Sequence, residues 1–529
     1  MIADMLLAIL ACNQVTNAAS SAATAQDSPD SGEPTSGDTD AEDSDTAPVD
    51  TATADDSGDT ATSDSGGGEA ADPFAPQPDD DEGLTNVAED LKDVLEHGDM
   101  ERACEAYEAD PADRRKKLLC GKSMYFNESF GTIGIPAPLF DFVNENFPDQ
   151  TGKAFSQYGL VPDPYSDEGR PIGFAAGAEL PDAPGVETLA LTCAACHFGR
   201  LPDGRYAVGA ANHDYDYGTH MLSLVLVPQV ANPLFDESAH SAEALAKVQP
   251  IIDVLRADWL LQLTLLWDLL PLLSAMDSMG NLDATAEGYY ASWLPGTMDF
   301  AIAPLPVDDG VHTVSKIIPL WGIPTASEEA AAGMPHAMLA WSGGATSLEQ
   351  FLTGFVVIGG GPLDEWPEER LEPLAEYIRS LRAPENASLP GTAESRAIGE
   401  SVFYDEGCVE CHGAPRGSGD RVYTYAEIGT DDAMMYWGDP DLDGELCCGL
   451  GFDEASEATH GIKSPRIAGA WTMGRFLHNG SVETLDGLLC LQGSRPSGLE
   501  APFGDDGHFY GCDLPEDERQ ALVDWLHSI

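Results

Sequence analysis

The chain has 529 residues, and its 91 acidic residues against 25 lysines and arginines give a formal net charge of −66. This length allows two or three domains with ample core. The acidic excess argues against nucleic acid and anionic lipid head groups as partners, because both carry the same sign of charge. It suits a basic redox partner protein, and it equally suits solubility or adaptation to salt.

The first residues predict export. Met5–Cys12 is a short apolar run, and its end, Ile9–Cys12, is similar to a bacterial lipobox in which Cys12 would be lipidated. No basic residue precedes the run, and the run is short for a signal peptide. A plain signal peptide with an unmodified Cys12, or a start further upstream, therefore stays open. We expect residues 1–12 to direct the protein to the periplasm or cell envelope, with a lipid as its only membrane anchor.

Residues 13–85 predict a disordered acidic linker. They are mostly small or acidic, and the first basic residue of the chain is Lys92. Such a segment cannot bury enough apolar surface to offset the entropy lost on folding. Repulsion between its charges extends it, so we expect a tether or a solvated tail.

The remaining chain predicts a mainly α fold with two cytochrome c-like haem domains, residues 86–387 and 388–529. Glu372–Leu381 and Gln520–Ile529 align without gaps, and both have apolar residues at helical spacing. A helix over Ala393–Tyr404 opens the second half, after a linker rich in proline and glycine at 383–392.

The first half is longer than a minimal cytochrome domain. We expect a helical extension over residues 86–125 and a long insertion after the first cysteine motif, with short strands at Tyr206–Ala210 and Val311–Ile318. Trp259–Leu273 is strongly apolar, but it is too short to span a bilayer comfortably and contains Gln262 and Asp268. This segment predicts a buried helix or one lining an apolar cavity.

Each half contains one Cys-x-x-Cys-His motif, Cys193–His197 and Cys408–His412. This pattern is typical of covalent haem c attachment, in which two thiols form thioethers and the histidine ligates the iron. The alternatives are structural disulfides or a zinc site, but zinc sites usually combine paired motifs rather than isolated ones. We therefore predict two covalent haems, held by Cys193, Cys196, Cys408 and Cys411, with His197 and His412 as iron ligands.

Six cysteines remain when Cys12 and the haem cysteines are set aside. An even remainder fits an oxidising compartment. Cys104 and Cys120 flank a helical stretch and are a candidate pair, and two further disulfides would use Cys447, Cys448, Cys490 and Cys512 in a connectivity that stays open.

The second half adds three ordered blocks, Lys463–Trp471, Arg475–Leu485 and Asp506–Gly511. Together with Arg170–Phe174 before the first motif, they resemble the bacterial di-haem cytochromes c, a family that includes the di-haem peroxidases and the rubber oxygenase-like group. Arg466-Ile467 stands where the family pattern has a single Leu-like position. The resemblance covers about residues 125 to 529 and implies an exported oxidoreductase.

The distal iron ligands decide the chemistry, because a haem with an open or displaceable position binds peroxide or dioxygen. For the second haem the resemblance implies His508 first and His478 second. For the first haem, His213 matches the displaceable histidine of the peroxidases, whereas in the oxygenase-like group the site is open. Solvent exposure is the simpler interpretation of His213, and a structural hydrogen bond that of His478.

Trp321 and Trp341 are predicted to line the pocket over the first haem, with Phe300 behind them. The resemblance also implies that Trp321 stands between the haems and relays electrons. Core packing is the alternative for each. Asp439–Gly444 is similar to the start of a calcium loop, but Leu450 stands where the bidentate glutamate is needed.

We therefore expect a di-haem oxidoreductase with peroxide, dioxygen or an apolar compound as substrate. The alternative is an electron carrier without enzymatic activity, in which both haems have two fixed ligands.

Overall fold

The computed structural model describes residue 74 and the ranges 81–180, 184–231, 235–269, 283–299, 313–325, 339–341, 347–413, 417–418, 421–436, 461–491 and 506–529, with single residues 343, 345, 495 and 504 between them. The signal-like segment, most of the predicted linker, Phe300, Cys447, Cys448 and the calcium-like loop lie outside the described residues.

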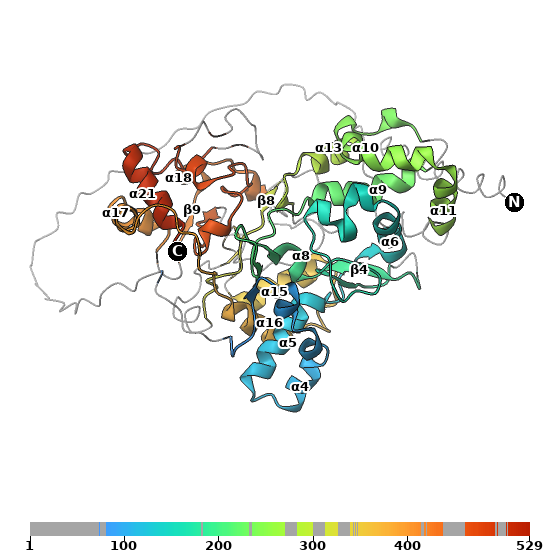
Figure 1. The fold of residues 1–529 in the computed structure, drawn as a ribbon, viewed down its shortest axis with the longest axis horizontal. Coiled ribbons are helices and arrows are strands. Elements are labelled where there is room, and N and C mark those ends of the chain that lie inside the picture. The colour runs from blue at the N-terminus through green and yellow to red at the C-terminus, as the bar shows by residue number, and fades with distance from the viewer. Residues whose placement is uncertain are drawn as a thin grey trace, which may run out of the picture. The chain divides into compact units, whose positions relative to one another are not determined.

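Four helices form the extension before the first cysteine motif, as predicted for residues 86–125. The disulfide Cys104–Cys120 ties the third of them to the fourth, and the fourth packs against a later helix, α16 (Glu368–Ser380) (Figure 1). Asp113 begins the fourth helix by accepting a hydrogen bond from the Lys116 backbone amide. The helices are α2 (Leu91–Leu95), α3 (His97–Met100), α4 (Ala103–Ala109) and α5 (Arg114–Asn127).

A second group of helices surrounds an apolar core in the first half. Its helix α9 (Tyr217–Val230) is buried over most of its length and packs against α10 (Ala242–Ala257) and α13 (Ala284–Ser292) (Figure 1). The remaining members are α6 (Ala137–Asn146), α7 (Pro148–Thr151), the 3-10 helix at Lys153–Tyr158 and α11 (Trp259–Leu269).

Short antiparallel strands place the first cysteine motif. The motif itself is the helix α8 (Cys193–His197), directly between β4 and β5. One sheet has the order β2-β4-β3 and another the order β1-β6-β5, while β7 pairs with β8. These strands are β1 (Val87–Ala88), β2 (Ile135–Pro136), β3 (Phe174–Ala176), β4 (Thr188–Leu191), β5 (Phe198–Arg200), β6 (Tyr206–Val208), β7 (Thr297–Met298) and β8 (Ser315–Lys316).

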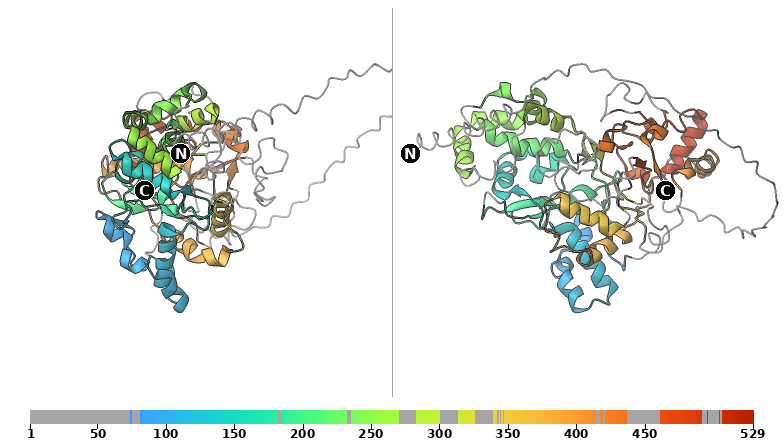
Figure 2. Two further views of the ribbon diagram at one scale, coloured as in Figure 1. Left: turned by 90° about the vertical axis from the view of Figure 1, so that its right-hand side faces the viewer. Right: turned by 180° about the vertical axis from the view of Figure 1, so that it is seen from behind.

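In the second half, α17 (Ala393–Asp405) packs along α21 (Glu516–Leu526), and Figure 2 shows this pair from behind. Gly399 allows the close approach, because a β-carbon there would lie 2.0 Å from the Ala521 carbonyl oxygen. Phe74, inside the predicted linker, packs on Phe403 and Trp525. The first half ends with α15 (Leu348–Ile358) and α16. The second half also contains α18 (Tyr425–Ile428), α20 (Leu485–Leu488), β9 (Val422–Tyr423) and β10 (Ile462–Lys463).

The mainly α prediction is confirmed, because helix is the prevailing regular structure of the described residues and the strands are few and short. Both predicted strands overlap observed ones, β6 and β8. The buried helix predicted at Trp259–Leu273 is wrong for one face: α11 buries Leu265 but leaves Trp259 and Trp267 69% and 63% exposed. None of the described helices has both the length and the apolar character needed to cross a bilayer.

We expect Gly399→Ala to destabilise the protein by about 1–3 kcal/mol, because the added methyl group overlaps a backbone carbonyl on α21. The urea midpoint of the purified chain measures this change. Gly98→Ala is the matched control, since Gly98 is also helical but has no atom within 4 Å of its β-carbon position. Equal midpoints for the two variants would contradict the tight α17–α21 contact.

Candidate functional site

The second cysteine motif holds its histidine by the backbone. Gly407, at φ 76°, turns the chain into the 3-10 turn Cys408–Glu410. The ring Nδ1 of His412 lies 3.3 Å from the Gly417 carbonyl oxygen and 3.2 Å from that of Pro465. Because only a protonated Nδ1 can bond to carbonyls, Nε2 of His412 carries the lone pair that a metal requires.

His508 stands opposite His412. Their ring centroids are 6.2 Å apart and the ring planes differ by 62°. Two imidazoles on opposite sides of one metal, at about 2 Å for each bond, have ring centres roughly 6 Å apart. Burial, aided by the charges of His412 and Arg495, lowers the pKa of His508 to about 4. The ring is therefore neutral at physiological pH, as a metal ligand must be.

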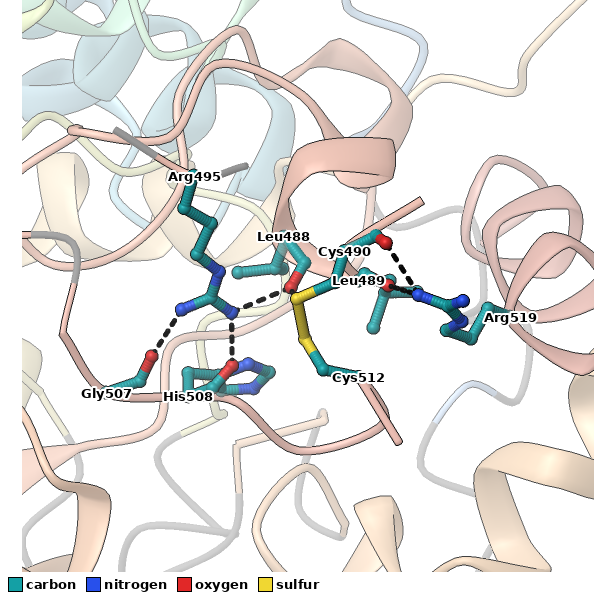
Figure 3. Close-up of a disulfide and its surroundings, with 8 residues drawn as sticks. All are labelled: Leu488, Leu489, Cys490, Arg495, Gly507, His508, Cys512 and Arg519. Atoms are coloured by element: carbon teal, nitrogen blue, oxygen red, sulfur yellow. Dashed lines mark hydrogen bonds between the residues drawn. A yellow bond between two sulfur atoms is a disulfide. The ribbon is translucent and has the colours of Figure 1, made fainter. Parts of the chain in front are cut away.

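Hydrogen bonds to backbone carbonyl groups hold the loop that carries His508. The Arg495 guanidinium donates to the carbonyls of Gly507, His508 and Leu488, and the disulfide Cys490–Cys512 lies beside it (Figure 3). His508 adopts φ 50°, in the left-handed region that non-glycine residues rarely occupy. These constraints fix the backbone from which the His508 ring projects.

His478 makes different contacts. Its Nδ1 lies 3.3 Å from the Thr430 hydroxyl. Its Nε2 is 3.2 Å from an Asp431 carboxylate oxygen, but without hydrogen-bond geometry. The structural role considered for His478 fits these contacts better than iron ligation.

The first cysteine motif lies deep in the first half. The His197 carbonyl accepts hydrogen bonds from the Tyr125 hydroxyl at 2.6 Å and from the Gly209 amide at 2.8 Å. Burial lowers the pKa of His197 to about 4, against an opposing contribution from the Ile318 carbonyl. Gly173 packs so closely on the motif that its β-carbon would lie 2.4 Å from the Ala195 backbone.

The described cysteines fall into two groups. Cys104–Cys120 and Cys490–Cys512 are disulfides, so the predicted pair is confirmed and Cys490 has a partner. The four cysteines of the two motifs are free thiols, which removes the structural disulfides considered for them. Burial raises the pKa of Cys193 and of Cys196 to about 12. Among the described residues no three His, Cys, Asp or Glu side chains gather as a metal cluster.

His213 is half-buried rather than solvated. Both of its ring nitrogens are shielded from solvent and lack a hydrogen-bond partner among the described residues. Burial, then the charges of Lys316, Arg475 and His197, lowers its pKa to about 3. Gly296 and Gly474 lie against it. A neutral ring with neither nitrogen hydrogen-bonded is what we expect for a side chain that faces a bound group.

Trp321 and Trp341 both bridge the two halves. Trp321 is buried, donates from Nε1 to the Val208 carbonyl at 3.0 Å, and accepts at its own carbonyl from Arg466 at 3.1 Å. Trp341 donates from Nε1 to the Lys316 carbonyl at 3.4 Å and accepts from the Lys463 amide at 2.7 Å. These contacts explain both residues as packing groups, and a role in electron relay stays a prediction.

Sequence reasoning missed Lys316. This buried lysine donates from Nζ to the Arg475 carbonyl at 3.0 Å and lies 5.3 Å from the centre of the Phe476 ring. Burial lowers the pKa of Lys316 to about 7. Burial also dominates the lowered pKa of His213, His412 and His508, and the charge of Lys316 adds to all three. Lys316 therefore lies near His213 and near the opposed histidines His412 and His508. Its position in a short predicted strand gave no sign of this in the sequence.

Sequence reasoning also missed His220, which lies in α9 and is fully buried. Its Nδ1 is 3.0 Å from the Tyr215 hydroxyl, while its Nε2 lacks a hydrogen-bond partner among the described residues. Burial alone lowers the pKa of His220 to about 3. A histidine within a helix of otherwise apolar sequence was the available signal.

No protein-family model matches this chain, and no curated protein sequence matches it either.

We expect His220→Phe to make the protein less sensitive to acid. The folded pKa of about 3 lies below the usual 6.5, so between these values only the unfolded chain binds the proton. Stability is therefore present above pH 6.5 and is lost as the pH falls towards 3, by up to about 1.4 kcal/mol per pH unit. Urea unfolding at pH 7, 5.5 and 4.5 measures the slope.

The control for this titration is His97→Gln, because His97 is an exposed histidine. An identical pH slope in wild-type protein and His220→Phe would show that His220 is protonated in the folded state.

Proposed function

We propose that the protein is an exported di-haem c-type cytochrome that acts as an oxidoreductase. The observation that supports this most is the opposed pair His412 and His508, 6.2 Å apart, beside two free thiols. The arrangement suits a haem whose iron both imidazoles ligate. A bound haem supplies an iron that exchanges single electrons.

The residues fit two such groups. Cys408 and Cys411 would form the thioethers of the second haem. The carbonyls of Gly417 and Pro465 would orient His412. The hydrogen bonds from Arg495 to the carbonyls of Gly507 and His508 would orient His508. Cys193, Cys196 and His197 would hold the first haem. Each half would then be a cytochrome c-like domain, closed by α16 or α21.

The two sites differ in a way that favours peroxide or dioxygen chemistry at the first haem. The second has a clamped histidine opposite its motif. Near the first, His213 has two buried nitrogens without partners among the described residues, and its backbone lies in a loop between β6 and α9. A ligand that can leave, or an open position, lets a small oxidant reach the iron. The His213 ring, neutral through burial, could then hold a proton of the bound oxidant at Nδ1 or Nε2.

The alternative function is an electron carrier, and His213 is also the observation that favours it. If one of its nitrogens ligates the first haem permanently, both haems have two fixed ligands and transfer electrons only. The acidic surface would dock a basic redox protein in either case. Peroxide, dioxygen and an apolar compound remain the proposed substrates, and the cell envelope the proposed location, with lipid at Cys12 as the anchor.

Electron paramagnetic resonance of the purified oxidised protein, repeated after half-reduction, distinguishes these functions. We expect one low-spin signal from the second haem and a high-spin signal from the first, present at once or appearing on half-reduction. Two low-spin signals that change neither on half-reduction nor on addition of cyanide would exclude the enzymatic function and support the electron carrier. A protein without covalent haem, by the pyridine haemochrome assay, would reject both functions.

Changing His508 to Ala should convert the second haem from low-spin to high-spin, because the clamped imidazole is its sixth ligand. The absorption spectrum of the ferric protein and its resonance spectrum measure this change. His478→Ala is the matched control, since His478 contacts Thr430 and Asp431 instead. Loss of the low-spin signal in the control alone would reverse the assignment of the two histidines.

A further inference from the structure

The side chain of His220 lies in a cage of aromatic rings. α9 supplies the histidine, and the rings come from α6, the 3-10 helix Lys153–Tyr158, β3 and the loop before α9. The ring centroids of Phe155, Phe140, Tyr158, Phe174 and Tyr215 lie 4.5, 5.6, 5.8, 5.9 and 5.9 Å from that of His220.

This cage selects one tautomer of His220. Nδ1 is 3.0 Å from the Tyr215 hydroxyl, and Nε2 is buried with no hydrogen-bond partner among the described residues. The face of an aromatic ring is negative, so it attracts an N–H group and repels a nitrogen lone pair. Nε2 therefore carries the proton, and Nδ1 accepts the hydrogen bond that the Tyr215 phenol donates.

Tyr215 lies close to the first cysteine motif. It belongs to the same buried cluster as Cys196. After burial, the charge of Cys196 is among the causes that raise the pKa of Tyr215, which requires the two side chains to be near each other. The backbone agrees, because the Asn212 amide donates to the Cys196 carbonyl and the Tyr215 amide to the Asn212 carbonyl. Tyr215 thus packs in the same core cluster as Cys196, which would hold the first haem.

We propose that Tyr215 and His220 form a redox pair for the first haem, in which Tyr215 loses an electron to the oxidised haem and its proton to His220. This inference rests on the proposed function. The phenolic O–H bond breaks and an N–H bond forms at Nδ1, which leaves a neutral tyrosyl radical and an imidazolium cation. Hydrogen peroxide is the oxidant: it takes two electrons and two solvent protons to become two waters, and Tyr215 supplies one of the electrons while the iron supplies the other.

Further aromatic rings continue from Tyr215. The centroid of Tyr217 lies 5.6 Å from that of Tyr215, that of Trp293 5.9 Å from Tyr217, and that of Tyr290 4.5 Å from Trp293. All four are buried. Oxidisable rings in successive contact let the oxidised state move along α9 and α13, away from the haem. The pair thereby protects the porphyrin and stores an oxidising equivalent until the electron returns from the redox partner and the proton from His220.

The test is freeze-quench electron paramagnetic resonance of the full haem-loaded chain after one equivalent of hydrogen peroxide. Ring-deuterated tyrosine, incorporated during expression, identifies a tyrosyl radical by its narrowed signal. We expect the radical in wild-type protein and a loss of about tenfold or more in Tyr215→Phe, which keeps the ring and removes only the hydroxyl. His220→Phe should lower the yield similarly, because no base then accepts the proton. Tyr377→Phe is the control, since this buried tyrosine bonds Asn86 in another cluster.

Haem content and the optical change on peroxide addition are recorded on the same samples. A haem that peroxide does not oxidise would overturn the proposed function, and the redox pair with it. A haem that is oxidised, with a radical equal in Tyr215→Phe and wild-type protein, would overturn the redox pair alone. If His220→Phe does not fold, the rate of radical formation in heavy water replaces it: a rate unchanged from that in ordinary water would show that no proton moves with the electron.

Discussion

The junction between the two halves is the constraint on which both cysteine motifs depend. The Lys316 amide donates to the His478 carbonyl at 2.7 Å, and the Arg466 guanidinium to the Trp321 carbonyl at 3.1 Å. A buried donor that loses its acceptor destabilises the fold. Moving one half relative to the other would break several of these hydrogen bonds at once, so the bonds hold the two halves in one arrangement. The positions of His213 and of the block around His478 are therefore set jointly, and the junction holds Lys316 near His213, His412 and His508.

Much of the helical framework could be predicted from the sequence because its signals are local. The apolar spacing of Gln520–Ile529 and of Glu372–Leu381 depends only on residues one or two turns apart, and both segments lie in or along helices α21 and α16. The pair Cys104–Cys120 follows from two cysteines on consecutive helices, α4 and α5, of one extension. The prediction for Trp259–Leu273 was wrong on its exposed face, because apolar composition does not tell which neighbours a helix finds.

The site was predictable only in part. The cysteines and histidines of the two motifs follow directly from the sequence pattern. His508 came from the family resemblance, and its ring does lie opposite His412. Lys316 and His220 have no such motif. Their properties arise from burial by segments far away in sequence, such as Phe476 for Lys316 and Phe140 for His220. His213 looked like a solvated loop residue for the same reason, since Gly474 lies over 250 residues downstream and packs against it.

The division of the cysteines has a consequence for how the protein is made. Thioether attachment would need Cys193, Cys196, Cys408 and Cys411 as reduced thiols, whereas Cys104–Cys120 and Cys490–Cys512 are oxidised in the same body. In an oxidising compartment, the two cysteines of each Cys-x-x-Cys motif meet the same oxidants as the cysteines that form disulfides. If haem is attached, maturation would therefore have to combine a reductant that acts on Cys-x-x-Cys with an oxidant that spares it. The chain would be a substrate for both, and Cys490–Cys512, which lies beside the His508 loop, would close correctly only if the two activities are kept apart in time or place.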